Sequence, residues 1–278
     1  MNAWLDGYLL PLLLGIPVGG MAFVAVMPAS DRVSLRHAGL GISTLTALLA
    51  FYAALFSLSS TAPSLPSLFT SWGGLLTGGL QFTVTPLRAG LLVVVTAMSP
   101  MILRAAAPRV MERTKGYVLL HLLFLALVVS ALLAQHAIVS LALLNAALLP
   151  LLLLLGLFGG NAKGSALLRV GMSWLIVDAL AFAALIWLLS RARSGELGAL
   201  KDAARAQSAE VQRFLFLALG LAAALRLAIV PTSGWVVSFL REAPLSAAAL
   251  TAVGVMPVGG LLFLELGLQL LPSAATTF

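Results

Sequence analysis

Long apolar runs recur along this chain, and each is close to the length at which an α-helix crosses a lipid bilayer. A spanning helix needs roughly 20 apolar residues, because the hydrocarbon core of a bilayer is about 30 Å thick. The clearest run, from Ala137 to Leu157, contains no charged residue. Eight runs are found, over residues 8–28, 38–58, 88–107, 117–134, 138–158, 168–190, 212–231 and 245–271. The sequence therefore predicts an all-α fold, a polytopic membrane bundle of about eight transmembrane helices.

The composition excludes several classes of protein. Of the 278 residues, 61% are hydrophobic and 9% are charged, whereas a soluble domain carries about 25% charged residues. The net charge of +7 comes from basic residues in short loops between apolar runs, a topogenic pattern rather than a nucleic-acid groove. The chain has no cysteine and three scattered histidines, and it lacks a phosphate-binding glycine loop and a His-Glu-x-x-His motif. No catalytic residue, metal ligand or cofactor is predicted.

The distribution of lysine and arginine predicts the orientation. With the N-terminus outside, nine basic residues fall on the inner side and six on the outer side, which favours both termini outside a bacterial-type inner (plasma) membrane. The first run lacks a basic leader and an Ala-x-Ala site, so we expect a permanent helix.

The outer loop 59–87 contains LQFTVTP, which is typical of a short strand, and residues 194–212 are typical of a surface helix.

Five polar side chains are expected within the apolar runs: His121, Asn145, Asp178, Arg226 and Glu265. A charge at the bilayer centre costs at least ~2.5–3.5 kcal/mol, so each is a candidate for the path of an ion. We hypothesise that Asp178 and Arg226 face each other and neutralise one another. Such a pair either serves an ion path or only holds helices together, and the sequence leaves both possibilities open.

The segment from Leu225 to Pro244 reads LRLAIVPTSGWVVSFLREAP. It lies between the seventh and eighth runs, yet it holds two prolines, a glycine, a tryptophan and three charges. Pro231 has no backbone N–H and is expected to break the helix. Gly234, Trp235 and Pro244 mark the rest of the discontinuous helix. The freed backbone groups require water or neighbouring helices, so the break is expected in the protein interior.

This segment resembles the broken-helix motif of the antiporter-like membrane subunits. These occur in respiratory complex I (NADH-quinone oxidoreductase), membrane-bound hydrogenases, Mrp cation/proton antiporters and inorganic-carbon uptake complexes. Arg226 falls on a lysine of that motif, Ser233 on a histidine and Glu242 on a glutamate. Asn145, five residues before Pro150, takes the place of a glutamate in the fifth helix. The resemblance adds Ser233 and Glu242 to the ion-path candidates that the apolar runs already supply, which are His121, Asn145, Asp178, Arg226 and Glu265.

The resemblance also implies a domain organisation. Residues 1–278 would form a single transmembrane domain, with three helices in 1–116 and a five-helix antiporter-like repeat in 117–278. Family members hold two inverted repeats that meet at a midplane site. With eight helices, this chain is expected to hold only the first repeat.

The departures from the family pattern set the functional expectation. Asn145 cannot ionise, and Arg226 stays protonated where a lysine can shift its pKa. We therefore expect a membrane subunit of a multi-subunit complex, structural or completing the proton or cation path of a partner. It would bind other membrane subunits, a soluble catalytic subunit and the lipid bilayer, without being catalytic itself. The alternatives are a conducting subunit that uses His121, Asp178 and Glu265, and an unrelated small-molecule transporter.

Overall fold

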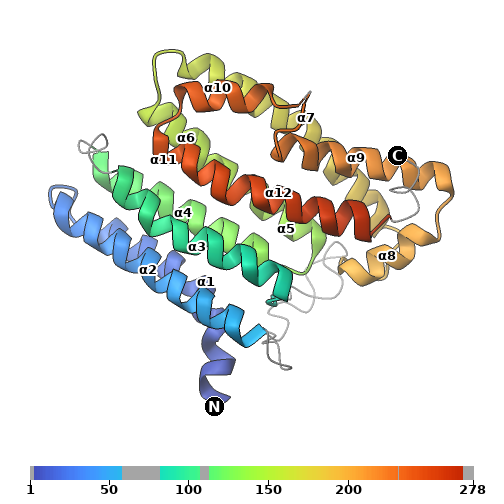
Figure 1. Ribbon diagram of the computed structural model, residues 1–278, viewed down its shortest axis with the longest axis horizontal. Coiled ribbons are helices and arrows are strands. Elements are labelled where there is room, and N and C mark those ends of the chain that lie inside the picture. Colours follow the sequence, from blue (N-terminus) through green and yellow to red (C-terminus); the bar gives the residue numbers. More distant parts are fainter. Residues whose placement is uncertain (1–2, 58–81, 107–112, 231, 272–278) are drawn as a thin grey trace.

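The computed structural model describes residues 3–57, 82–106, 113–230 and 232–271, and these fold into a helical bundle (Figure 1). The described part contains no strand, which confirms the predicted all-α fold. The N-terminal elements are α1 (Ala3–Val26), α2 (Arg32–Ser57), α3 (Pro86–Ala106), α4 (Thr114–Leu133), α5 (Ala137–Ala146) and α6 (Leu148–Phe158). The C-terminal elements are α7 (Lys163–Leu189), α8 (Leu197–Arg205), α9 (Ala209–Arg226), α10 (Gly234–Glu242), α11 (Leu245–Leu250), η3 (Thr251–Val255), α12 (Met256–Leu262) and η4 (Phe263–Gln269).

Seven helical segments of the described residues are long and apolar enough to cross a membrane. They are Tyr8–Val26, Arg32–Ser57, Pro86–Ala105, Thr114–Leu133, Ala137–Phe158, Lys163–Leu189 and Leu245–Gln269. The seventh predicted run, over residues 212–231, corresponds to α9, which has 18 residues and contains Glu210, Arg213 and Arg226. This helix is shorter than each of the other seven segments, and after a break the chain continues as α10.

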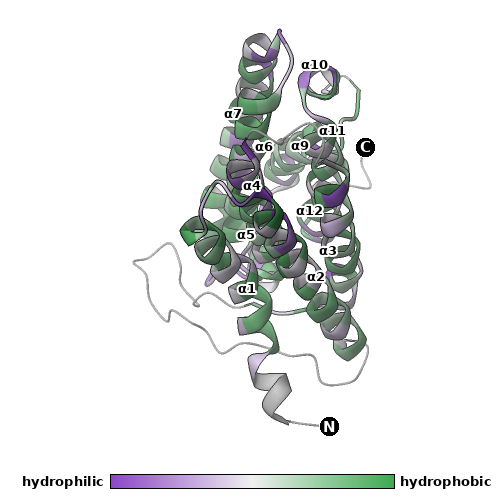
Figure 2. Ribbon diagram, turned by 90° about the vertical axis from the view of Figure 1, so that its left-hand side faces the viewer, coloured by the Kyte–Doolittle hydropathy of each residue, from purple (hydrophilic) through white to green (hydrophobic). Residues whose placement is uncertain are grey.

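The helices are coloured as hydrophobic over most of their length (Figure 2). On α7, Leu168 and Leu175 are 71% and 66% exposed, which suits contact with lipid and not with water. The centre is α4, which is 67% buried, more than any other candidate span. It packs against α1, α2, α3, α5 and α6.

The start of α2 is stabilised by a side-chain cap. The backbone N–H of Ser34 donates to Oδ1 of Asp31 over 3.0 Å, which caps the start of α2. The hydrogen bonds from Ser34 hold the pKa of Asp31 below its usual value.

The predicted strand in LQFTVTP is reduced, within the described residues, to one isolated bridge between Phe82 and Ala134. The rest of the loop before Phe82 lies outside the described residues.

Two of the spanning segments are interrupted next to a proline. The break between α5 and α6 falls at Ala147, because the ring of Pro150 clashes with the carbonyl four residues earlier and removes one donor. In the last span, the N–H of Met256 donates to Thr251, five residues back, in the π-helical η3 just before Pro257. Such π-turns within α-helices are frequent at functional sites.

The third break, between α9 and α10, does not occur where the sequence predicted. The helix α9 ends at Arg226, before Pro231 is reached, and Pro231 itself lies outside the described residues. The N–H of Ala228 donates to Leu225 and the N–H of Ile229 to Ala224, the two hydrogen bonds of a Schellman motif. Ala228 has a φ of +56°. The left-handed residue at the helix end, not the proline, therefore terminates α9.

Replacing Ala228 with glycine is expected to stabilise the protein. The left-handed conformation is costly for a residue with a Cβ atom and readily adopted by glycine, so the expected gain in the free energy of unfolding is about 0.5–1 kcal/mol. The matched control is Ala224→Gly, in the last helical turn, which should lose about 0.5–1 kcal/mol. Unfolding in mixed micelles measures both. Equal losses in the two variants would contradict this account of the break.

Candidate functional site

The guanidinium of Arg226, which is 1% exposed, lies at the meeting point of three helices. Its Nη2 is 2.6 Å from Oδ1 of Asp178, a residue of α7. The same nitrogen donates to Oδ1 of Asn145 over 2.9 Å, next to the break between α5 and α6. Nη1 donates to the carbonyl of Ala222 over 2.9 Å. The predicted pairing of Asp178 with Arg226 is confirmed, and Asn145 joins it. We call these three residues the Arg226 cluster.

Two tryptophans surround the Arg226 cluster. The guanidinium carbon of Arg226 lies 5.0 Å from the ring centroid of Trp174, a cation–π arrangement. Trp235, from α10, packs edge-on against Trp174 with a centroid separation of 5.2 Å. Its Nε1 donates to the carbonyl of Leu225 over 2.7 Å, the carbonyl that also accepts the N–H of Ala228 where α9 ends. Trp235 thus supports the break from the side of α10.

Trp174 was missed by the sequence analysis. It precedes Asp178 by four residues on α7, and side chains at that spacing lie on the same helix face, so the signal was present once Asp178 had been chosen. Gly259 of α12 packs directly on the aliphatic stem of Arg226, where a Cβ atom would have no room. This contact fits the close helix packing that small residues permit in membranes.

The chemistry of the Arg226 cluster is that of a neutral, fixed unit. Arginine remains protonated in proteins, and the carboxylate of Asp178 compensates its charge. Asn145 contributes an amide oxygen but no charge. The cluster can therefore join α5, α7 and α9 at a point where two of these helices end, and it can fix the positions of their freed backbone groups.

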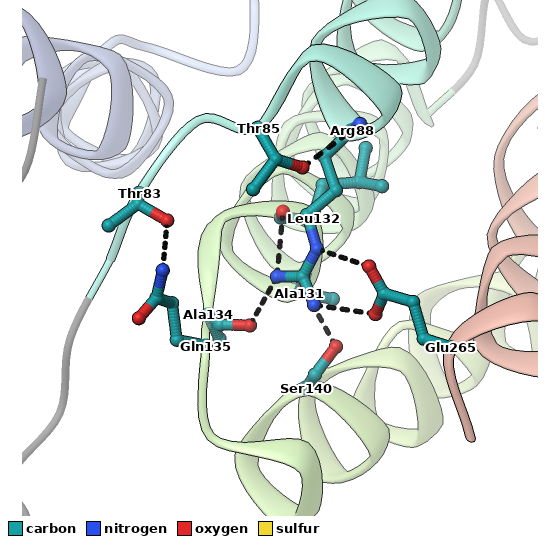
Figure 3. A network of polar contacts seen from close by, with 9 residues as sticks. All are labelled: Thr83, Thr85, Arg88, Ala131, Leu132, Ala134, Gln135, Ser140 and Glu265. Carbon is teal, nitrogen blue, oxygen red and sulfur yellow. Dashed lines mark hydrogen bonds and ion pairs between the residues drawn. The ribbon is translucent and has the colours of Figure 1, made fainter. Parts of the chain in front are cut away.

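His121 and Glu265 each have another partner. His121 is fully buried on α4, and its Nε2 shares a hydrogen bond of 2.8 Å with the hydroxyl of Ser99 on α3. Glu265, in η4, accepts two hydrogen bonds from Arg88, from Nε to Oε1 over 2.8 Å and from Nη2 to Oε2 over 2.6 Å (Figure 3). Both residues of this second pair are 7% exposed.

Arg88 also donates hydrogen bonds to the C-terminal end of α4. Its Nη1 donates to the carbonyl of Ala134 over 2.5 Å and to that of Leu132 over 3.3 Å (Figure 3). Leu132 lies in the last turn of α4 and Ala134 is its C-cap residue, so their carbonyls have no intrahelical donor. From the sequence, Arg88 was only one of the six basic residues assigned to the outer side. One side chain from the start of α3 therefore joins the end of α4 to the π-helical η4.

The remaining predicted site residues lie at the two ends of α10. Ser233 and Gly234 stand at the start of α10, and Pro244 precedes α11. The carbonyl of Glu242 accepts a hydrogen bond from Gly160 over 2.9 Å, and its Oε2 accepts one from the N–H of Ala162 over 3.0 Å. The structure thus places Glu242 at the turn between α6 and α7, apart from the contacts of the Arg226 cluster.

A membrane bundle with buried charges at interrupted helices is a construction typical of ion-translocating membrane proteins. No family model and no curated protein matches the chain. Among solved structures it is similar to a chain of respiratory complex I from Thermus thermophilus with bound NADH. The TM-score is 0.80 and the identity 24%, over 96% of this chain and 54% of that one.

It is also similar to a chain of the membrane-bound sulfane sulfur reductase, an archaeal respiratory membrane complex. The TM-score is 0.73 and the identity 14%, over 90% of this chain and 51% of that one. The chain thus spans about half the length of both solved chains. It has the fold of a complex I-type membrane subunit, which confirms for the fold the resemblance found in the sequence.

Proposed function

We propose that this chain is a membrane subunit of a multi-subunit ion-translocating or energy-converting complex, and that it is structural or completes the ion path of a partner. One observation carries the proposal. Within the described spanning segments, the carboxylates are those of Asp178 and Glu265, and each is held by an arginine. A proton carrier has to change its protonation during a cycle, whereas each of these carboxylates is bound directly to an arginine, which keeps its charge.

The second candidate function is conduction by the chain itself, with His121, Asp178 and Glu265 as the titratable groups. The three interrupted helices favour it, since such breaks line hydrated sites in transporters. The two arginine pairs favour the first candidate. The similarity to chains of respiratory complexes also supports a role beside other membrane subunits and a soluble catalytic subunit, over that of an unrelated small-molecule transporter.

We further propose both termini outside a bacterial-type inner membrane, and a division into three N-terminal helices (1–116) and a five-helix repeat (117–278). Basic side chains at one end of the bundle support this orientation. Lys115 donates to the carbonyls of Ala25 and Met27 over 2.7 and 2.8 Å, and Arg36 donates to that of Arg104 over 3.3 Å. These contacts anchor positive charge where the predicted inner surface lies.

Proton and sodium flux through proteoliposomes tests the proposal. The purified chain is expected to give the same flux as protein-free vesicles, because each buried carboxylate is occupied by an arginine that keeps its charge. Asp178→Asn, with the exposed Asp202→Asn as its matched control, should leave that baseline unchanged. Flux through the wild-type chain that Asp178→Asn abolishes and Asp202→Asn spares would replace the proposal with the conducting alternative.

A further inference from the structure

An apolar groove runs between α7 and α9, on the side of the bundle that carries α8 (Figure 1). Its volume is about 470 Å³, within the range of about 300–1,000 Å³ of small-molecule sites. Leu180, Ala183 and Trp187 line it from α7, and Glu210, Val211 and Phe214 line it from α9. Leu180 is 44% exposed and Phe214 is 65% exposed. Since α7 is one of the seven candidate membrane spans, we expect the groove to open toward lipid.

One end of the groove carries a fixed cation. The guanidinium carbon of Arg191 lies 3.7 Å from the ring centroid of Trp187, a residue of the groove wall. Its Nη1 donates to the carbonyl of Trp187 over 3.3 Å and to the hydroxyl of Ser190 over 3.2 Å. The side chain is thereby held at the end of α7. Tryptophan and arginine at a helix end are typical of the headgroup level of a membrane.

The same end carries an anion and an uncapped helix start. Glu210 is the second residue of α9 and lines the groove. Within the described residues, neither Glu210 nor Arg191 takes part in an ion pair. Ser208, at the N-cap position, makes no side-chain capping hydrogen bond. The first N–H groups of an 18-residue helix therefore lack a side-chain acceptor, and such groups favour phosphate.

We propose that this groove is a binding site for an aminophospholipid. One acyl chain lies along the apolar wall formed by Leu180, Ala183 and Phe214. The phosphate lies between Arg191 and the start of α9, and the primary ammonium donates to the carboxylate of Glu210. The pattern of one fixed cation beside one fixed anion complements a zwitterionic headgroup whose ammonium can donate hydrogen bonds. It disfavours an anionic lipid such as phosphatidylglycerol, whose headgroup carries a phosphate but no cation to pair with Glu210.

Native mass spectrometry of the purified chain, with defined lipids added to the detergent, tests the site. Palmitoyl-oleoyl phosphatidylethanolamine is expected to remain bound more tightly than the phosphatidylcholine and phosphatidylglycerol of the same chains. Glu210→Gln should lower the affinity for phosphatidylethanolamine by about two- to fivefold, the range of an exposed ion pair. It should leave the affinity for phosphatidylcholine unchanged. Arg191→Gln should weaken all three lipids together.

Two further variants decide what fills the groove. Ala183→Trp, at an exposed wall position, should block all three lipids, while Asp202→Asn on α8 should change none of them. Equal affinity of the wild-type chain for the three lipids would overturn the proposal, and so would a phosphatidylethanolamine preference that survives Glu210→Gln. Retention of a polypeptide in place of lipid, lost in Ala183→Trp, would assign the groove to a helix of a partner subunit instead.

Discussion

Replacing Asp178 with asparagine is expected to lower the free energy of unfolding by about 3–5 kcal/mol, because it leaves a buried arginine without its counter-charge. Arg226 is 1% exposed, and Asp178 supplies the acidic group within 4 Å of it. The amide of asparagine keeps the shape of the carboxylate, so the loss reports charge and not packing. Unfolding of the purified protein in mixed micelles, followed by far-ultraviolet circular dichroism, measures the change.

The matched control removes both charges at once. A double variant with Asp178→Leu and Arg226→Met leaves no uncompensated ion, and replacing a buried pair with apolar residues of similar size is often close to neutral. The double variant should therefore be more stable than Asp178→Asn alone. If the single variant lost less than about 1 kcal/mol, as for an exposed ion pair, the Arg226 cluster would be hydrated enough to solvate a lone arginine. That result would favour the conducting alternative.

The sequence was informative wherever a polar residue interrupted an apolar run. Asp178 and Arg226 could be paired in advance because two opposite charges in neighbouring spans have few other ways to be accommodated in lipid. Asn145 was found through its place before Pro150. In each case the physical cost of the residue in a bilayer made it conspicuous, and the structure places Asp178 and Asn145 at 2.6 Å and 2.9 Å from the same guanidinium nitrogen of Arg226.

The second charge pair could not be predicted by the same argument. Arg88 stands at the start of a helix, where an arginine is usually a topogenic anchor, and its partner Glu265 is 177 positions away. Arg88 binds the backbone carbonyls of Leu132 and Ala134. Every residue has such a carbonyl, so the identities of Leu132 and Ala134 do not predict the contact. Pairing them requires knowing that the start of α3, the end of α4 and η4 meet, which is a property of the folded bundle.

The end of α9 was misplaced for a related reason. A proline is a strong sequence signal for a helix break, and a Schellman motif is usually recognised by its glycine. Here the left-handed position is Ala228, which carries no such signal, so the break was assigned to Pro231. The backbone hydrogen bonds from Ala228 and Ile229 satisfy the carbonyls at the end of α9 before the proline is reached.

Replacing Arg88 with methionine is expected to cost about 3–5 kcal/mol of unfolding free energy, because it leaves Glu265 buried without a partner. It also removes the donor to the carbonyls of Leu132 and Ala134, and each unsatisfied buried acceptor adds about 1–3 kcal/mol. Glu265→Gln should cost less than Arg88→Met, since the guanidinium then keeps both carbonyls. Unfolding in mixed micelles compares the two variants directly.

A charge reversal separates the two roles of Arg88. In the double variant with Arg88→Glu and Glu265→Arg, the attraction between the two side chains remains, so a pure ion pair would be largely restored. The carbonyls of Leu132 and Ala134 would instead face a carboxylate, an acceptor opposite acceptors. We therefore expect the reversed variant to be no more stable than Arg88→Met. Recovery of wild-type stability would mean that the pairing with Glu265 alone accounts for Arg88, and that the end of α4 needs no side-chain donor.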